Sequence, residues 1–248
     1  MKNTLYSLII LLSSFVIGIQ AQSAERNTHK TTVKHIYLTF DDGPLNGSQR
    51  INDAVLTEKL PIFVMLVGEH ALARPEDVKL YKENKFIGSG NHSYSHANNH
   101  YKLYYSTPKG VLNDFIKNKN ILKLDNKIGR LPGRNMWRIN GRSKNDVSSG
   151  IVAADLLANN GFSLFGWDLE WAHDPHTGKP IGTAEDIFKK IEEKFNNDKT
   201  FTKSHIVLLS HDEMFRHQYE ESELKKLIDF LKSRDDYKIS QLKDYPKL

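Results

Sequence analysis

Residues 33–44 read VKHIYLTFDDGP, and this stretch guides the interpretation of the whole sequence. Its first part, 33–40, is rich in β-branched and aromatic residues, which predicts a strand. The strand breaks at Asp41-Asp42-Gly43-Pro44, where Asp-Gly is typical of a turn and by itself needs no chemical role. Two adjacent carboxylates are costly to bury together. Because the chain turns here, however, they can point in different directions, so that one binds a metal and the other stays free as a base.

Outward from this stretch, strand and helix patterns alternate. Further strands are expected at 62–67, 86–88, 162–167, 205–210 and 237–239, and helices at 50–60, 75–84, 107–124, 147–160, 184–195 and 222–231. Such alternation predicts parallel strands covered by helices. About seven strands suit either a barrel or a wound open sheet, and in both the chemistry collects at the carboxyl ends of strands. No linker divides residues 33–248, so we expect one domain.

The N-terminus has the layout of a signal peptide. Lys2 precedes an apolar run, and small residues follow from Ala21 onward. We therefore expect residues 1–21 to be removed on export and 22–32 to form a flexible lead-in. The alternative is a retained membrane anchor, but the run is shorter than the ~20 residues of a spanning helix, and polar residues interrupt it. The chain has no cysteine, which excludes disulfides and lipid attachment to cysteine.

The charge balance narrows the function classes only a little. Without Lys2 the chain keeps 34 Lys and Arg against 30 Asp and Glu. This small excess suits an anionic surface such as a cell wall, and it is also common in proteins that bind nothing acidic. No long basic run or aromatic-rich basic repeat indicates nucleic-acid binding. The sequence contains no His-Glu-x-x-His motif, so it gives no indication of a metalloprotease.

A histidine-rich cluster, Asn91-His92-Ser93-Tyr94-Ser95-His96, follows the short strand expected at 86–88. Histidines at i and i+4 face the same way on a helical turn and can share one cation. His96 and His100 have the same spacing and form a competing pair, and a polar loop without ligands is the alternative to both. An aspartate with two histidines makes a metal site that leaves positions open for water and substrate.

Three further polar clusters follow along the chain. The strand at 205–210 carries His211 at its carboxyl end, Arg130-Leu131-Pro132-Gly133-Arg134 places arginines around a rigid turn, and Trp167-Asp168-Leu169-Glu170-Trp171 combines aromatics with acids. An arginine can orient a carboxylate, and aromatics beside acids suit sugar binding or the tuning of a histidine. Each cluster also has a purely structural explanation: a histidine at a strand end, a basic loop, and tryptophans in the core.

The order of these clusters resembles that of the NodB-homology polysaccharide deacetylases, carbohydrate esterase family four. The similarity runs from Thr39-Phe40-Asp41-Asp42-Gly43-Pro44 through His92-Ser93-x-x-His96, Arg130-x-Pro132 and the Trp/acid segment to Leu209-x-His211, and it covers about residues 33–245. The resemblance implies a distorted (β/α) barrel with about seven parallel strands. It also implies one divalent metal ion, usually zinc, although cobalt or nickel suits the same ligands.

The resemblance assigns roles to individual residues. The metal ligands would be Asp42, His92 and His96, the general base Asp41, the general acid His211, the arginine that positions the base Arg130, and the wall of the acetyl methyl pocket Leu209. These roles make chemical sense, because a metal polarises an amide carbonyl and an imidazole, with its reference pKa of ~6.5, can protonate the departing amine.

Further assignments rest on the segments around these motifs. We expect the backbone N–H of Tyr94 to assist the oxyanion and Trp171 to contact the sugar. Asp168 is the expected acidic partner of His211, with Glu170 and Asp174 as rivals.

Two departures from the family pattern are visible. The arginine motif usually reads Arg-x-Pro-x-Gly, whereas here Arg134 stands in the last place and Gly133 comes one residue early. This difference indicates an altered loop and substrate groove. The Trp/acid motif usually has an aspartate before the tryptophan, whereas this chain has Glu170-Trp171.

The sequence thus predicts a metal-dependent hydrolase that removes N-acetyl groups from a glycan containing N-acetylglucosamine. Chitin oligomers, peptidoglycan and poly-N-acetylglucosamine all carry the same acetamido group. The alternatives are an O-acetyl esterase that acts on polymers such as xylan, and a catalytically inactive carbohydrate-binding protein. We expect an exported protein, periplasmic or secreted, that is monomeric, binds no nucleic acid and has no stable membrane insertion once the leader is removed.

Overall fold

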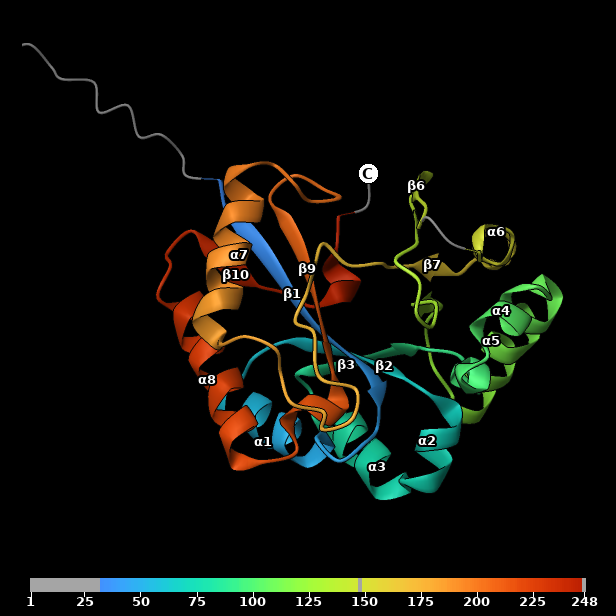
Figure 1. Cartoon of the computed structure of the whole chain (residues 1–248), viewed down its shortest axis with the longest axis horizontal. Coiled ribbons are helices and arrows are strands. Elements are labelled where there is room, and N and C mark those ends of the chain that lie inside the picture. Colours follow the sequence, from blue (N-terminus) through green and yellow to red (C-terminus); the bar gives the residue numbers. More distant parts are fainter. Residues whose placement is uncertain (1–31, 147–148, 247–248) are drawn as a thin grey trace, which may run out of the picture. The chain divides into compact units, whose positions relative to one another are not determined.

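A mostly parallel, curled sheet with helices around it forms the centre of the computed structural model, which describes residues 32–146 and 149–246 (Figure 1). Along the sheet the strands follow the order β6 (Arg142–Lys144), β5 (Trp137–Ile139), β7 (Ser163–Leu164), β4 (Ile128–Gly129), β3 (Ile87–Asn91), β2 (Ile62–Leu66), β1 (Lys34–Gly43), β9 (His205–His211) and β8 (Leu169–Glu170). A tenth strand, β10 (Tyr237–Ile239), pairs with the start of β1. The distorted (β/α) barrel predicted from the sequence is confirmed, with a short antiparallel hairpin, β5–β6, added at one edge.

Strands β1 and β9 are neighbours near the β8 edge of the sheet, and the alternation of side chains along them separates two faces. The side chains of Ile36, Leu38 and Phe40 belong to the main core beneath the helices. Residues one position along, such as Thr39 and Asp41, therefore point to the opposite, concave face. The sequence 33–40 favours a strand because its residues are β-rich and can be buried on both faces of a sheet. Pairing with strands on both sides then satisfies the backbone N–H and C=O groups of β1.

Helices cover the outside of the curled sheet. They are α1 (Ser48–Glu58), α2 (Gly68–Ala73), α3 (Pro75–Glu83), α4 (Tyr101–Tyr105), α5 (Pro108–Leu122), α6 (Ile151–Asn159), α7 (Ala184–Asn196) and α8 (Gln218–Lys232). Helix α7 follows its sequence pattern closely: Thr183 and Asp186 form a capping box, and Ile187, Ile191 and Phe195 are buried on one stripe. A second core, formed by α4, α5 and α6, packs around Phe115, Leu157 and Leu164.

Some elements differ from the sequence-based expectation. Helix α6 starts at Ile151, later than the predicted 147, and residues 147–148 lie outside the described part of the chain. The hairpin β5–β6 was not predicted, because Arg142-Ser143-Lys144 carries no apolar alternation. The predicted signal peptide at 1–21 and all but the last residue of the lead-in also lie outside the described residues.

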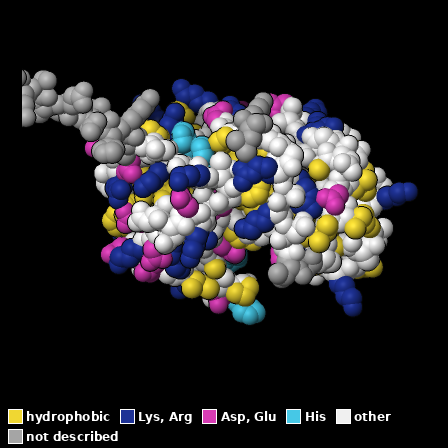
Figure 2. Space-filling view, turned by 90° about the horizontal axis from the view of Figure 1, so that it is seen from above, with side chains coloured by type: hydrophobic (Ala, Val, Ile, Leu, Met, Phe, Trp, Pro, Cys, Tyr) yellow, Lys and Arg dark blue, Asp and Glu magenta, His cyan; other side chains and the backbone are white. Residues whose placement is uncertain are grey.

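The described part of the chain contains no helix long and apolar enough to cross a membrane. Seen from above, its Lys and Arg side chains are scattered among Asp and Glu on that face rather than gathered into one patch (Figure 2). This distribution agrees with the small net charge of the sequence.

A stacked pair of histidines lies at the start of β1 and β9, at the end of the sheet away from Asp41. The rings of His35 and His205 are 4.6 Å apart and nearly parallel, and their Nδ1 atoms lie 3.0 Å from the Ser240 hydroxyl and 2.8 Å from the Tyr37 hydroxyl, respectively. Burial, reinforced by the neighbouring His35, lowers the pKa of His205 to about 4. Burial and the charge of Lys238 lower the pKa of His35 as well.

This pair makes folding stability sensitive to acid. His205 stays neutral in the folded protein, whereas the unfolded chain binds a proton below about pH 6.5. Stability is therefore fully present above about pH 6.5 and is lost as the pH falls toward about 4. Because the ring is half exposed, we expect a loss of only about 1–2 kcal/mol. Urea denaturation at pH 7 and 4.5 measures it, and His205→Gln should show a smaller pH dependence; an identical slope in the variant would contradict the assignment.

Candidate active site

Asp41 and Asp42 end strand β1 and point in different directions, as the sequence predicted. Asp41 continues the strand and pairs in register with His211 of β9. Asp42 has a φ of 68°, in the left-handed region, at a shift in the register between β1 and β2. This irregularity turns its side chain away from that of Asp41. The imidazole of His70 on α2 holds the turn, with its Nδ1 2.6 Å from the Asp42 carbonyl oxygen.

Asp42, His92 and His96 converge on one point. Their ligand atoms lie within 4.8 Å of one another, and Asp42 Oδ1 is 3.3 Å from His92 Nε2 and 3.0 Å from His96 Nε2. Burial opposes ionisation of Asp42, yet its contacts with the two histidines hold its pKa well below the usual range. Burial likewise opposes the charge of His92, but Asp41 and Asp42 raise its pKa. The site therefore favours positive charge.

The donor and acceptor pattern fits a divalent cation. His92 Nδ1 lies 2.9 Å from the Arg130 carbonyl oxygen, which can only accept, so the ring proton sits on Nδ1. The lone pair of His92 Nε2 is then left facing Asp42 Oδ1, a buried atom for which the described residues supply no hydrogen-bond donor. Acceptors gathered without a donor are what a zinc-type ion requires, and the backbone contact orients the histidine as in established metal sites.

The backbone that carries the two histidines differs from the expected helical turn. His92 directly follows β3, and His96, Ala97, Asn98 and Asn99 all have φ between 45° and 60°. The i, i+4 spacing brings the rings to 5.0 Å through this left-handed turn, not through a right-handed helix. The expectation of a helical turn was therefore wrong, although the pairing of His92 with His96 was right. His100 does not belong to the cluster of ligand atoms among the described residues.

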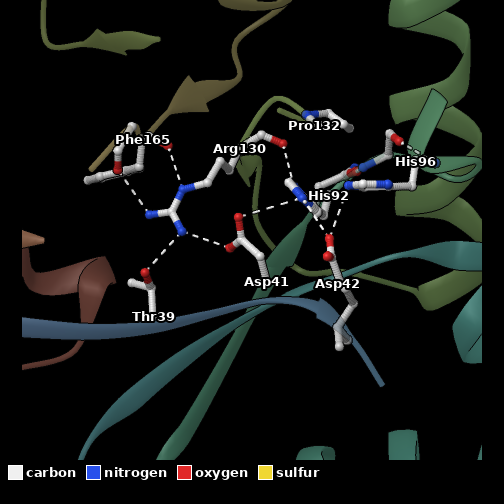
Figure 3. A network of polar contacts seen from close by, with 12 residues as sticks. Thr39, Asp41, Asp42, His92, His96, Arg130, Pro132 and Phe165 are labelled. Carbon is white, nitrogen blue, oxygen red and sulfur yellow. Dashed lines mark hydrogen bonds and ion pairs between the residues drawn. The ribbon is translucent and has the colours of Figure 1, made fainter. Parts of the chain in front are cut away.

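Arg130 organises the floor of the site (Figure 3). Its guanidinium is fully buried and donates to Asp41 Oδ1 at 2.7 Å and to the Thr39 hydroxyl at 2.9 Å. The carbonyl oxygens of Phe165 and Gly166 accept its remaining hydrogen bonds, at 3.0 and 2.9 Å. These contacts fix the Asp41 carboxylate, whose other oxygen, Oδ2, lies 3.5 Å from His92 Nε2. Arg130 thus lies where the sequence predicted, beside Asp41.

His211 and Leu209 lie on the same face as Asp41. They are two residues apart on β9, and their register partners on β1 are Asp41 and Thr39. Burial lowers the pKa of His211, and the carboxylates of Asp42 and Asp41 offset this only in part. The Nδ1 of His211 is buried, and no described residue forms a hydrogen bond with it. The structure therefore brings the predicted acid, base and metal ligands together at one end of the sheet.

The acidic partner predicted for His211 was wrong. Asp168 accepts hydrogen bonds from the backbone N–H groups of Phe201 and Val207, at 2.6 and 2.9 Å, and so anchors the chain beside β9 instead. Its burial raises its pKa to about 6. Asp174, one rival, accepts from the backbone and hydroxyl of Thr177 and shapes an exposed turn.

Glu170, the other rival, lies close enough to the site for its charge to matter. Burial raises its pKa, the negative charge of Asp41 adds to this effect, and Arg130 opposes it. No hydrogen bond between Glu170 and His211 is present in the described structure. The Asp-to-Glu exchange in this motif therefore coincides with a histidine that lacks a carboxylate partner.

Two predicted substrate contacts were also wrong. Trp171 is fully buried in the main core, where its ring meets Phe215 edge to face at 5.8 Å and its indole N–H points to the Gly182 carbonyl at 3.4 Å. It cannot contact a glycan from there. The backbone N–H of Tyr94 donates to Asp114 Oδ2 at 3.1 Å. The N–H expected to assist the oxyanion is therefore already engaged by this carboxylate.

Sequence analysis missed two residues of the site. The ring of His173 lies 4.5 Å from that of His211, on the loop that follows β8. The sequence feature that could have identified His173 is its position two residues beyond the Trp/acid motif. Asp212 is fully buried and accepts from the Ser48 and Tyr81 hydroxyls at 2.8 and 2.5 Å, which holds the turn after Asp42. An aspartate next to a strand-end histidine could have signalled it.

Comparisons with known proteins agree with this site. The family model described as polysaccharide deacetylase matches residues 28–146, a segment that contains Asp41, Asp42, His92, His96 and Arg130. Over this segment, which is just under half of the chain, the sequence is similar to the polysaccharide deacetylase family. A curated relative, the chitin disaccharide deacetylase of Vibrio alginolyticus, is 25% identical over 201 residues, which cover 55% of this chain and 47% of the relative. The chain thus aligns with about half the length of that relative.

Solved structures share the fold. A carbohydrate esterase of family four from Streptococcus mutans is 19% identical, with a TM-score of 0.64, and the match covers 85% of this chain and 87% of that one. The catalytic domain of a peptidoglycan N-acetylglucosamine deacetylase from Eubacterium rectale is 21% identical, with a TM-score of 0.63, and covers 85% and 89%. These similarities concern the architecture of the sheet and helices.

Proposed function

We propose that this protein is a metal-dependent hydrolase that removes N-acetyl groups from a glycan containing N-acetylglucosamine. The observation that carries the proposal is the convergence of Asp42, His92 and His96 beside Asp41, with His211 on the next strand. The match of residues 28–146 to the polysaccharide deacetylase family model supports the reaction type. The relatives named for chitin disaccharide and peptidoglycan deacetylation support an N-acetylated sugar as the substrate.

Asp42, His92 and His96 would hold a divalent cation, and such an ion would supply the Lewis acidity that polarises an acetyl carbonyl and lowers the pKa of water. Arg130 holds one oxygen of Asp41 and leaves Oδ2 to take a proton from the attacking water. The hydroxyl joins the acetyl carbon to give a tetrahedral intermediate. His211, in its protonated form, then protonates the sugar nitrogen, the C–N bond breaks, and acetate and a free amine leave. Asp41 releases the proton taken from water and His211 takes one up, so both residues return to their starting states.

The remaining residues position the reacting groups. Arg130 orients Asp41, because its buried guanidinium has that carboxylate as its only anionic partner among the described residues. Leu209 is buried on the face of Asp41 and His211 and offers an apolar wall for the acetyl methyl group. The leader pattern at 1–21 supports export to the periplasm or the medium, where such glycans occur.

Acetate release from a panel of glycans tests the proposal. We expect the zinc-loaded protein to release acetate from N-acetylated chitin oligomers or peptidoglycan strands much faster than from acetylated xylan. A preference for xylan would identify an O-acetyl esterase. Binding to these glycans without acetate release from any of them would identify a carbohydrate-binding protein and overturn the proposal.

A further inference from the structure

Arg134, which stands where the family motif usually has glycine, has an unusual environment. Its guanidinium lies over the rings of Tyr105 and Tyr101, 4.7 and 5.7 Å from their centroids. Its hydrogen bonds go to the carbonyl oxygens of Ser149 and Gly133, at 2.8 and 2.7 Å, and to the Ser149 hydroxyl at 3.3 Å. All three acceptors are neutral. Because a guanidinium has five N–H groups, some donors remain for another ligand.

Among the described residues Arg134 forms no ion pair, although the Asp146 carboxylate lies close by and accepts from the backbone N–H of the adjacent Asn135 at 3.1 Å. Six arginines of the described chain lie within ion-pair distance of a carboxylate, namely Arg50, Arg74, Arg130, Arg138, Arg216 and Arg234. Over residues 32–146 and 149–246, no carboxylate lies that close to Arg134. Arg142 shares this property, but it is engaged by Thr202 and Phe201. A half-buried cation without an anion is a ready site for an anionic ligand.

Arg134 lies at the rim of the active site. Tyr101 connects the two: its ring meets the His96 ring edge to face at 5.9 Å, while Arg134 lies over the same ring. Pro132, two residues earlier, is seen beside His92 and His96 in Figure 3. The Tyr105 hydroxyl donates to the Pro132 carbonyl at 2.6 Å and fixes the loop. The guanidinium is thus held in place before any ligand arrives.

We propose that Arg134 binds a carboxylate carried by the glycan, so that the substrate is an acidic N-acetylated glycan. The inference rests on the proposed deacetylase function and names its substrate class. The planar fork of a guanidinium matches a carboxylate with two parallel hydrogen bonds. Stacking on Tyr101 and Tyr105 orients this fork and adds cation–π attraction. Because Tyr101 lies between Arg134 and His96, we expect the bound carboxylate to belong to a sugar at or next to the reacting one.

The test compares matched acidic and neutral substrates. Peptide-free glycan strands of peptidoglycan carry lactyl carboxylates, and the same strands with these groups reduced to alcohols are neutral. Heparosan oligosaccharides, whose carboxylates belong to uronic acids, distinguish the two sources of this group. We expect the wild-type kcat/KM to be higher for the acidic strands, and Arg134→Gln to lower the acidic-to-neutral ratio by about fivefold, chiefly through KM. Salt should weaken the preference.

Arg138→Gln is the matched control, because that nearby guanidinium is already paired with Asp155 at 2.6 Å. It should leave the acidic-to-neutral ratio at the wild-type value, and Arg134→Lys should keep part of the preference. Equal wild-type rates on acidic and reduced strands, or equal losses on both in Arg134→Gln, would overturn the inference while acetate release still supported the deacetylase function.

A binding measurement separates failure of the two ideas. Calorimetry with Asp41→Asn, in which turnover is blocked, gives the affinity for acidic and reduced strands with and without Arg134→Gln. If wild-type protein released no acetate from any glycan, the deacetylase proposal would fail, and the affinity ratio would still decide whether Arg134 recognises a carboxylate.

Discussion

Asp41→Asn is expected to lower kcat by about 10³-fold, the typical contribution of a positioned general base. The amide has nearly the shape of the carboxylate but cannot accept the proton of the attacking water. Because Asp41 is not one of the three converging ligands, the dissociation constant for zinc should change little. Acetate release under saturating substrate measures the first quantity, and metal titration followed by calorimetry measures the second.

The same substitution also affects folding, which calls for a control. It leaves the buried Arg130 without its anionic partner, and removal of one member of a buried ion pair costs about 3 kcal/mol. Asp168→Asn is the matched control: it also removes a buried carboxylate, but one bonded to backbone N–H groups away from His211. It should lose stability and keep most of its kcat. If Asp41→Asn kept wild-type turnover, Asp41 would not be the base.

Removal of the metal is the second large effect. A strong chelator should abolish measurable acetate release, and added Zn²⁺ should restore it, with Co²⁺ or Ni²⁺ as substitutes. Zinc binding should also raise the thermal midpoint, since a ligand at 100 times its dissociation constant stabilises the folded state by about 2.7 kcal/mol. Differential scanning calorimetry with and without the ion gives a readout that does not depend on turnover.

Variants identify the ligands independently. His92→Gln should weaken zinc binding at least tenfold and abolish the thermal shift, because it removes one of the converging acceptors. His100→Gln is the control, since this histidine has the same i, i+4 relation to His96 but lies outside the cluster. Retention of full activity in chelator-treated protein, or loss of zinc by His100→Gln alone, would contradict the assigned site.

Sequence patterns predicted the parts of this molecule that have strong periodicity. Strand β2 matched its continuous apolar run, and helix α7 its stripe of Ile187, Ile191 and Phe195. The convergence of Asp42, His92 and His96 near Arg130 could be predicted, because motifs at strand ends meet at one edge of a parallel sheet. The short strands and the β5–β6 hairpin escaped, since two or three residues cannot establish a period.

The errors came from local competition that a sequence does not reveal. Trp171 lies in the core because its ring packs against Phe215, whereas the ring of His173, two residues on, lies beside that of His211. The backbone N–H of Tyr94 is not free for its expected role, because it donates to Asp114, twenty residues away on α5. The left-handed turn at 96–99 contains no glycine, and although Asn98 and Asn99 tolerate this conformation, four successive residues in it could not be foreseen from residue type alone. Each outcome depends on a tertiary contact.

Asp41 and His211 are opposite each other on neighbouring hydrogen-bonded strands, and the spacing of a β-ladder, about 4.8 Å, varies little. The backbone pairing therefore fixes the separation between Asp41, the proposed base, and His211, the proposed acid. Arg134, Tyr101 and the loop of His173 lie on other segments of the chain. If the proposed function is right, reaction chemistry and substrate preference can change independently: loop substitutions should alter glycan preference without changing the spacing of Asp41 and His211.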